Sequence, residues 1–172
     1  MALSTNLKKT ARKIEAVLTG TEPEADLLDT LKEEHEDVKH LLQELLDATT
    51  SARRKALLKQ IKLALVPHAR AEEKVLYDAI LAVKDKKANQ DGQEGYIEHH
   101  IVDRMVGDLS KISNAMSTEF SAGAKVLKEL LEHHIREEEG DVWSDAREHF
   151  SLEQRQKMNA KFIKAKASVK VS

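Results

Sequence analysis

Two stretches of this sequence combine histidine and glutamate at a spacing that favours metal coordination. One reads His-Ala-Arg-Ala-Glu-Glu from His68 to Glu73, and the other reads His-Ile-Arg-Glu-Glu-Glu from His134 to Glu139. On a helix, residues four apart lie on one face about one turn apart, so each histidine and the glutamate after it point the same way. Imidazole with carboxylate suits iron, manganese or zinc, and ligand type does not choose among these metals.

Both stretches also lie on rows of residues that the apolar pattern places in a protein core. Steps of three and four residues connect His68 and Glu72 with Leu58, Ile61, Leu65, Val75 and Ala79. The same steps connect His134 and Glu138 with Leu127 and Leu131. A carboxylate without a partner is costly to bury, so we expect these glutamates to be protonated, ion-paired or bound to a metal.

Each stretch is preceded by a second apolar row that carries one more histidine. His35 falls in a row with Leu28, Leu31, Val38, Leu42 and Leu45, and His99 falls in a row with Val102, Val106 and Leu109. The two preceding segments align with each other, so a half-repeat of two helices occurs twice. Four histidines and two glutamates then face inward from four helices, which fits a dinuclear centre bridged by carboxylates.

The position of each histidine relative to the apolar row is more informative than its spacing from an acidic residue. Six of the eight histidines have Asp or Glu four residues later. In a helical chain so rich in charged residues, this spacing alone is only modestly informative. His40 lies off the core rows, which indicates a surface pair. His133 points about 100° away from His134 and should also face solvent. A duplicated set of inward histidines favours a metal over hydrogen-bonded core histidines.

The composition predicts an all-α protein and excludes several classes of site. The 172 residues suffice for one domain with a core, and they include two prolines, six glycines and no cysteine. Without cysteine there are no disulfides, thiolate ligands, iron–sulfur clusters or cysteine nucleophiles. The Glu-x-x-His motif of ferritin-like bundles, the zincin motif, the P-loop and the Gly-rich dinucleotide turn are also absent.

The charge and hydropathy of the chain favour a cytoplasmic protein that binds neither nucleic acid nor membrane. The net charge is −2, and no run of about 18 apolar residues or apolar N-terminal leader occurs. We divide the chain into an N-terminal arm or short helix (1–23), a four-helix metal-binding bundle (24–150) and a basic C-terminal helix or tail (151–172). The terminal segments are the candidates for docking a protein partner.

Local signals place the helices of the bundle. We expect them at about 24–47, 52–83, 96–116 and 124–139, with a polar connection at 84–95 and a terminal helix at about 152–167. Pro67 lies inside the second helix, where it is either a tolerated kink or a device that aims His68. Gly140 is expected to make a local irregularity.

These motifs, in this order, resemble haemerythrin-like (HHE cation-binding) domains from about Asp26 to Phe150. The resemblance rests on Glu34-His35, His68 to Glu73, Glu98-His99-His100, and His134 to Glu139. It implies an up-down-up-down four-helix bundle around a non-haem di-iron centre. The implied ligands are two histidines for each iron and two bridging glutamates: His35 and His68, His99 and His134, and Glu72 and Glu138.

One departure from the oxygen-carrying members affects the expected function. Those members have a further histidine four residues after the third-helix histidine, where this chain has Asp103. The change disfavours reversible oxygen carriage and makes Asp103 a candidate substitute ligand. The first hypothesis is a protein that binds or senses oxygen, peroxide, nitric oxide or iron. The alternatives are an enzyme that decomposes peroxide or oxidises ferrous iron, and a plain helical bundle with a vestigial or zinc-filled site.

Overall fold

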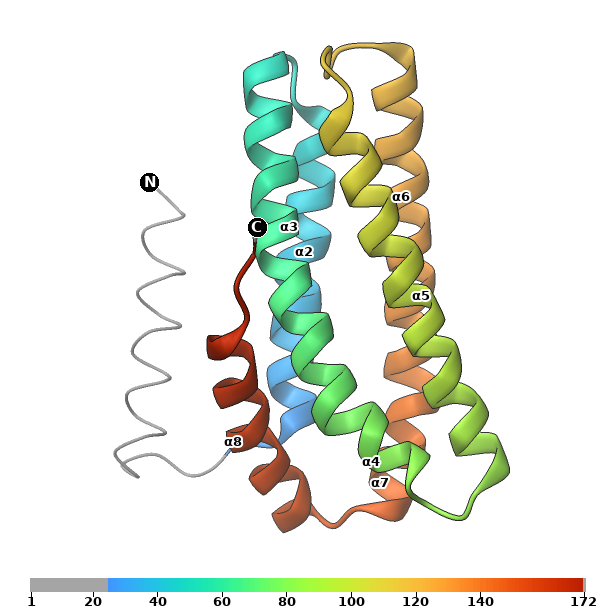
Figure 1. Ribbon diagram of the computed structural model, residues 1–172. Helices are drawn as coiled ribbons and strands as arrows, with labels where there is room; N and C mark the ends of the chain where they lie inside the picture. The colour runs from blue at the N-terminus through green and yellow to red at the C-terminus, as the bar shows by residue number, and fades with distance from the viewer. Residues whose placement is uncertain (1–24, 172) are drawn as a thin grey trace.

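The protein is an all-α bundle, as the composition predicts. The computed structural model describes residues 25–171, so the arm or helix expected at 1–23 lies outside the described residues. Four long helices run up, down, up and down (Figure 1): α2 (Leu27–Asp47), α3 (Ser51–Glu72), α5 (Lys86–Lys111) and α6 (Thr118–Glu137). The shorter elements are η1 (Glu73–Tyr77), α4 (Asp78–Leu81), η2 (Glu138–Val142), α7 (Trp143–His149) and α8 (Leu152–Ser168). The described helices include none long and apolar enough to cross a membrane.

Polar side chains at the first residue of each long element explain where the helices begin. The N-caps are Asp26, Thr50, Asp85, Ser117 and Ser151, and each accepts a hydrogen bond from a backbone N–H of the first turn. Two expected boundaries are therefore wrong. The segment 84–95 is mostly helix because Asp85 caps α5, which begins at Lys86, ten residues before the predicted start at 96. Ser117 caps α6, which begins at Thr118 instead of 124.

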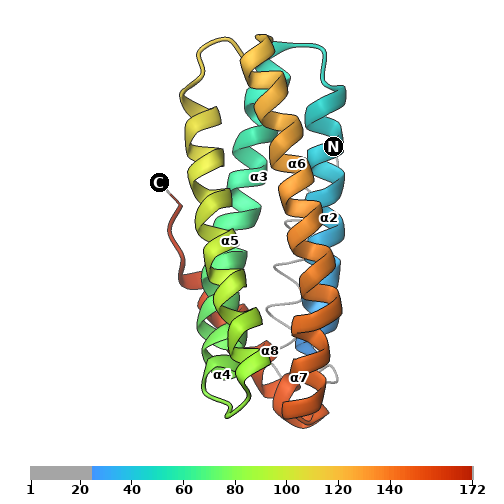
Figure 2. The same ribbon diagram turned by 90° about the vertical axis from the view of Figure 1, so that its right-hand side faces the viewer.

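Two apolar clusters hold the bundle together, and a polar layer separates them. One cluster joins all four long helices towards the α2–α3 and α5–α6 turns and includes Leu42, Ile61, Val106 and Leu127. The other is built around Leu31, Tyr77, Trp143 and Phe162. It lies at the opposite end of the bundle, where α4, α7 and α8 are found (Figure 2). The predicted histidine and glutamate positions lie in the layer between them.

Helices α3 and α6 both continue into a π-helical segment at the layer of polar residues. Residues nine apart on a regular α-helix point about 180° apart, so Tyr77 would lie opposite His68, and Trp143 opposite His134. The i→i+5 hydrogen bonds of η1 and η2 take one extra residue into the turn. Tyr77 and Trp143 are consequently buried. The irregularity expected at Gly140 is this π segment.

The same extra residue corrects the predicted core row beyond Glu72. The sequence pattern continued that row through Val75 and Ala79, yet Ala79 is only partly buried. The fully buried residues of this part of the chain are Leu76, Tyr77 and Ile80. Helix α3 is continuous through Pro67, and the departure from α geometry comes at Glu73 instead.

The C-terminal helix α8 lies alongside α2 and α3 (Figure 1). Phe162 is fully buried, and Arg155 makes an ion pair with Asp26, the N-cap of α2. The capping box of Ser151 and Gln154 fixes the start of α8, as the sequence indicated. One face of the basic segment is therefore part of the core.

Two glycines of α5 provide a matched test of this packing. A Cβ on Gly95 would lie 2.5 Å from the ring of the buried Tyr77, whereas a Cβ on Gly107 would meet nothing within 4 Å. We predict that Gly95→Ala destabilises the protein by about 1–3 kcal/mol, because a rigid ring must shift. Gly107→Ala should stabilise it by about 0.5–1 kcal/mol, since alanine favours a helix. Urea unfolding measures both; equal effects would contradict the close contact.

Candidate metal centre

Six buried side chains converge in the polar layer, and they are the six that the sequence pattern placed there. None is more than 6% exposed: His35, His68, Glu72, His99, His134 and Glu138. Their ligand atoms form two groups, in each of which all atoms lie within 4.8 Å of one another. The first group contains His35, His68, Glu72 and Glu138, and the second contains Glu72, His99 and His134. Glu72 belongs to both groups.

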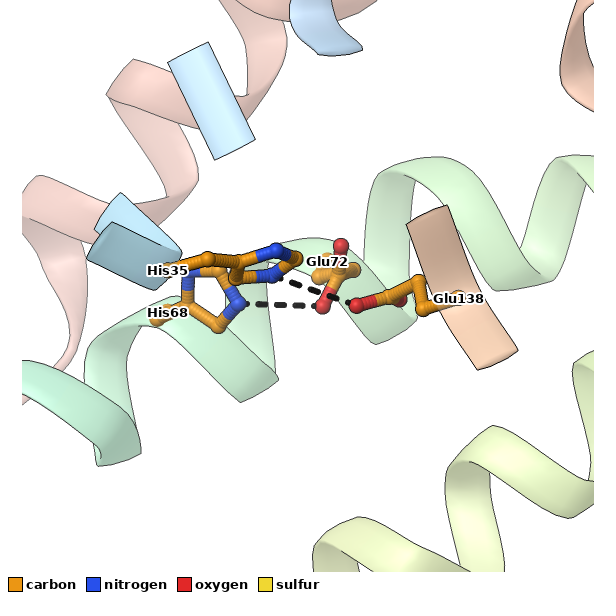
Figure 3. Close-up of side chains that lie close together, drawn as sticks. All are labelled: His35, His68, Glu72 and Glu138. Atoms are coloured by element: carbon orange, nitrogen blue, oxygen red, sulfur yellow. Dashed lines mark ion pairs between the residues drawn. The ribbon is translucent and has the colours of Figure 1, made fainter. Parts of the chain in front are cut away.

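Each core glutamate faces one histidine from each half of the repeat. Figure 3 shows His35 and His68 side by side, with their rings directed at Glu138 and Glu72. The Nε2 atoms of these two histidines lie 3.2 Å from Glu138 Oε2 and 3.2 Å from Glu72 Oε2, respectively.

The histidines of the second half complete the arrangement at slightly longer distances. His99 Nε2 lies 3.6 Å from Glu72 Oε2, and His134 Nε2 lies 3.6 Å from Glu138 Oε2. All four imidazoles thus direct Nε2 towards the same two carboxylates. Both carboxylates therefore lie between the two halves of the repeat.

The other ring nitrogen of each histidine contacts a glutamate in an outer layer. The Nδ1 distances are 3.0 Å for His35 to Glu139, 2.9 Å for His68 to Glu34, 3.1 Å for His99 to Glu73 and 2.6 Å for His134 to Glu98. Such carboxylates fix the tautomer and orientation of a histidine that binds metal through its other nitrogen.

The apolar pattern predicts no role for these four outer glutamates, although their positions in the sequence repeat. Glu34 and Glu98 directly precede the core histidines of α2 and α5, and Glu73 and Glu139 directly follow the core glutamates. Each outer glutamate therefore recurs at the same place in both halves. Its partner lies on a different element, so sequence spacing alone does not connect the two.

The donor atoms at the centre fit a metal cation. Four of them are buried and make no hydrogen bond: His35 Nε2, Glu72 Oε1, Glu72 Oε2 and Glu138 Oε2. Buried polar atoms are otherwise nearly always hydrogen-bonded, so the lack of hydrogen bonds at these donors is what a site for a positive charge would show. Imidazole nitrogen and carboxylate oxygen are donors that divalent iron, manganese and zinc accept.

Without a metal, protons supply part of the positive charge. Burial alone lowers the pKa of His68, but the charge of Glu72 and the hydrogen bond with Glu34 outweigh it and raise the pKa to about 10. Burial also lowers the pKa of His134, and the charge of Glu138 raises it above its usual value. Burial raises the pKa of Glu34, yet the contacts with His68 and Lys166 bring it to about 2.

Aromatic rings surround the histidines. Trp143 stacks on His35 with centroids 5.8 Å apart, and Phe162 of α8 meets His68 edge-on at 6.0 Å. Tyr77 lies 5.4 Å from His99, and its hydroxyl donates a hydrogen bond to Glu138 Oε1 at 2.5 Å. These rings keep the imidazoles in place and restrict water on their side of the centre.

Asp103 is the predicted site residue that the structure does not bring into either ligand group. It forms an ion pair with Arg70, which also contacts the outer glutamate Glu73. Asp103 does line the large cavity described next, on the same side as His99. Its role as a ligand stays a prediction.

His133 is 47% exposed and lies 3.2 Å from Glu137, as the predicted phase of α6 requires.

A cavity of about 610 Å³ reaches all four histidines. Its inner wall is apolar and includes Val38, Leu65, Val102, Leu131 and Ile135. Four of the charged side chains along its lining form two pairs, since Glu44 contacts Arg53 and Glu34 contacts Lys166. Small uncharged molecules therefore have room beside the centre.

Comparisons with known proteins agree with this description. The chain matches the family model described as the hemerythrin HHE cation binding domain over residues 26–143. It is also 28% identical over 155 residues to a protein called DNA nickase from Nostoc sp. strain PCC 7120. That match covers 90% of this chain but 43% of the relative, so the chain spans less than half of the relative's length. No solved structure matches significantly.

The adjacent histidines of α6 test which face binds metal. His134→Ala should abolish binding of at least one metal equivalent, because it removes a buried donor that is 3% exposed. His133→Ala should keep full binding. At metal concentrations near 100 Kd, bound metal adds about 2.7 kcal/mol to stability, so thermal unfolding with and without metal reports the difference. Equal loss of metal from two folded variants would contradict the geometry.

The raised pKa of His68 predicts how the stability of metal-free protein depends on pH. Its unfolded pKa is about 6.5 and its folded pKa about 10, so its stabilising contribution is present below pH 6.5 and lost as pH rises through 10. We expect chelator-treated protein to lose stability over this interval in urea unfolding. Metal-loaded protein should show no such loss, because metal displaces the proton. Rising stability of the metal-free protein would contradict the assignment.

Proposed function

Because the chain belongs to the hemerythrin HHE cation-binding domain family, we propose that it is a non-haem di-iron protein. Its centre would bind or respond to oxygen, peroxide, nitric oxide or iron supply. One observation carries the proposal: Glu72 and Glu138 each lie within 3.6 Å of one histidine from either half of the repeat. Two carboxylates shared in this way support two bridged ions better than a single ion.

The proposed ligands divide evenly between the two ions. His35 and His68 would hold one iron, His99 and His134 the other, and both core glutamates would bridge. When bound, such a pair supplies ferrous–ferric redox chemistry and open coordination positions for small molecules. The protein contributes orientation through the outer glutamates and a partly apolar surrounding through Trp143, Phe162 and Tyr77.

The large cavity supports small-molecule access to the proposed centre. It reaches each of the four histidines, and its paired charges leave the apolar inner wall as the surface that a small guest meets. Oxygen, nitric oxide and peroxide are all small enough for a space of about 610 Å³. Such molecules can therefore reach the proposed centre without an opening of the helical bundle.

A second candidate function is turnover of peroxide or oxidation of ferrous iron. The observation that favours it is the ion pair between Asp103 and Arg70. Asp103 stands where the oxygen-carrying members have a further histidine, and the ion pair holds its side chain away from both ligand groups. Fewer protein ligands leave more positions open to water and peroxide, which favours reaction over storage of an intact adduct. Asp103 as a substitute ligand is the competing proposal.

The relative called DNA nickase bears on the expectation that nucleic acid is not a partner. The chain spans 43% of that protein, and its net charge is −2. We retain the absence of a nucleic-acid partner as a proposal for this chain.

Iron loading tests the proposed centre directly. Protein reconstituted anaerobically with ferrous iron should bind two equivalents, since the donors form two overlapping groups. On mixing with oxygen in a stopped-flow spectrometer, it should convert irreversibly to an oxo-bridged diferric form with near-ultraviolet absorption. His134→Ala should lose this band and His133→Ala should keep it. Binding of one equivalent without the band would end the di-iron proposal.

The same material separates the two candidate functions. Peroxide decomposition by the diferric protein, lost in His134→Ala, would favour the enzyme. A long-lived oxygenated species that releases oxygen under vacuum would instead restore reversible carriage.

A further inference from the structure

A second, smaller cavity approaches the proposed centre from the side of α5 and η2. It has a volume of about 90 Å³, and we call it the acidic vestibule. Six carboxylate residues line it: Asp91, Glu94, Glu98, Glu137, Glu138 and Asp141. They range from exposed Glu94 and Asp141 at the surface to Glu138, which is 1% exposed. The vestibule thus runs from solvent to a core glutamate of the metal centre.

The buried end of the vestibule carries the carboxylate of Glu138. Its Oε2 makes no hydrogen bond and lies 3.2 Å and 3.6 Å from the Nε2 atoms of His35 and His134, while Oε1 accepts a hydrogen bond from Tyr77. His134 lines the same end. Gly95 forms part of the wall, and its missing side chain leaves the space that the Tyr77 ring occupies. A cation that entered would meet carboxylates of increasing burial and then the donors of the centre.

The two cavities differ in their electrostatics. In the large cavity, Glu44 is paired with Arg53, Glu34 with Lys166 and Asp103 with Arg70. The lining of the vestibule contains no lysine or arginine; Lys87, outside the lining, contacts Asp91 and Asp141. Apart from His134 at its buried end, the charged groups that line the vestibule are carboxylates, and a narrow cleft in which one sign of charge predominates concentrates the opposite ion and speeds its association by about 10- to 1000-fold.

We propose that the acidic vestibule is the route by which a divalent metal cation enters the centre, whereas the large cavity serves uncharged small molecules. This inference rests on the proposed metal-binding function. It assigns to Glu94, Asp141 and their neighbours a role in the rate of loading. Because the outermost carboxylates lie away from the ligand groups, their loss should leave the number of bound ions unchanged.

Cobalt(II) uptake by the full chain tests the route, with the single tryptophan as reporter. Trp143 stacks on His35, so a paramagnetic ion at the centre quenches its fluorescence. The test variant combines Glu94→Gln with Asp141→Asn. The control combines Asp37→Asn, in the large cavity, with Asp108→Asn, on the exposed face of α5. Both variants remove two negative charges at exposed positions, and circular dichroism checks their folding.

We expect the test variant to load cobalt about 5- to 10-fold more slowly than wild type at about 10 mM salt, and the control to load at nearly the wild-type rate. The difference should disappear near 1 M salt, where screening is effective within about 3 Å. Final quenching and stoichiometry should be the same in all three proteins. An unchanged rate in the test variant, or equal slowing in the control, would overturn the route alone. Absence of cobalt binding by wild type would overturn the proposed metal function with it.

Discussion

The burial of two carboxylates in the middle of a helical bundle is the constraint on which the rest of the structure depends. Glu72 and Glu138 are at most 1% exposed, and three of their four oxygens make no hydrogen bond. Their charge must be balanced, and imidazoles on every side do so with protons or by sharing a cation. The imidazoles need a second layer of glutamates to orient them. That layer connects each helix of the bundle to a neighbour.

The sequence predicts the inner layer well because its members interrupt regular apolar rows. His35, His68, His99 and His134 are each preceded or followed by core leucines, valines or isoleucines at helical spacing, and all four are buried. The sequence predicts the start of α5 poorly, since residues 86–95 are mostly polar and include two glycines that pack against other elements. It also places the start of α6 too late in the chain. The π segment η1 was missed, and η2 was expected only as an irregularity at Gly140, because periodicity assumes a constant turn. The available signal was an aromatic residue nine positions after His68 and nine positions after His134.

The two halves of the repeat share a plan but differ in detail. Tyr77 and Trp143 follow their core glutamates by five residues, yet the tyrosine hydroxyl bonds to Glu138 whereas the indole nitrogen of Trp143 has no hydrogen-bond partner. Glu34 contacts Lys166, while Glu98, its counterpart, lies in the acidic vestibule. The outer glutamate of His68 is therefore paired with a lysine, whereas no lysine or arginine lines the vestibule beside His134.

Helix α8 lies beyond the residues that match the family, yet it reaches the innermost histidines. Phe162 touches the ring of His68, and Lys166 holds the glutamate that orients that ring. Occupancy of the centre and docking of α8 are therefore linked equilibria. Thermodynamic reciprocity then requires that whatever displaces α8 alters metal affinity, and that metal alters the free energy of α8 docking by the same amount. A molecule that bound only the undocked form of α8 would therefore change the affinity of the proposed centre for metal.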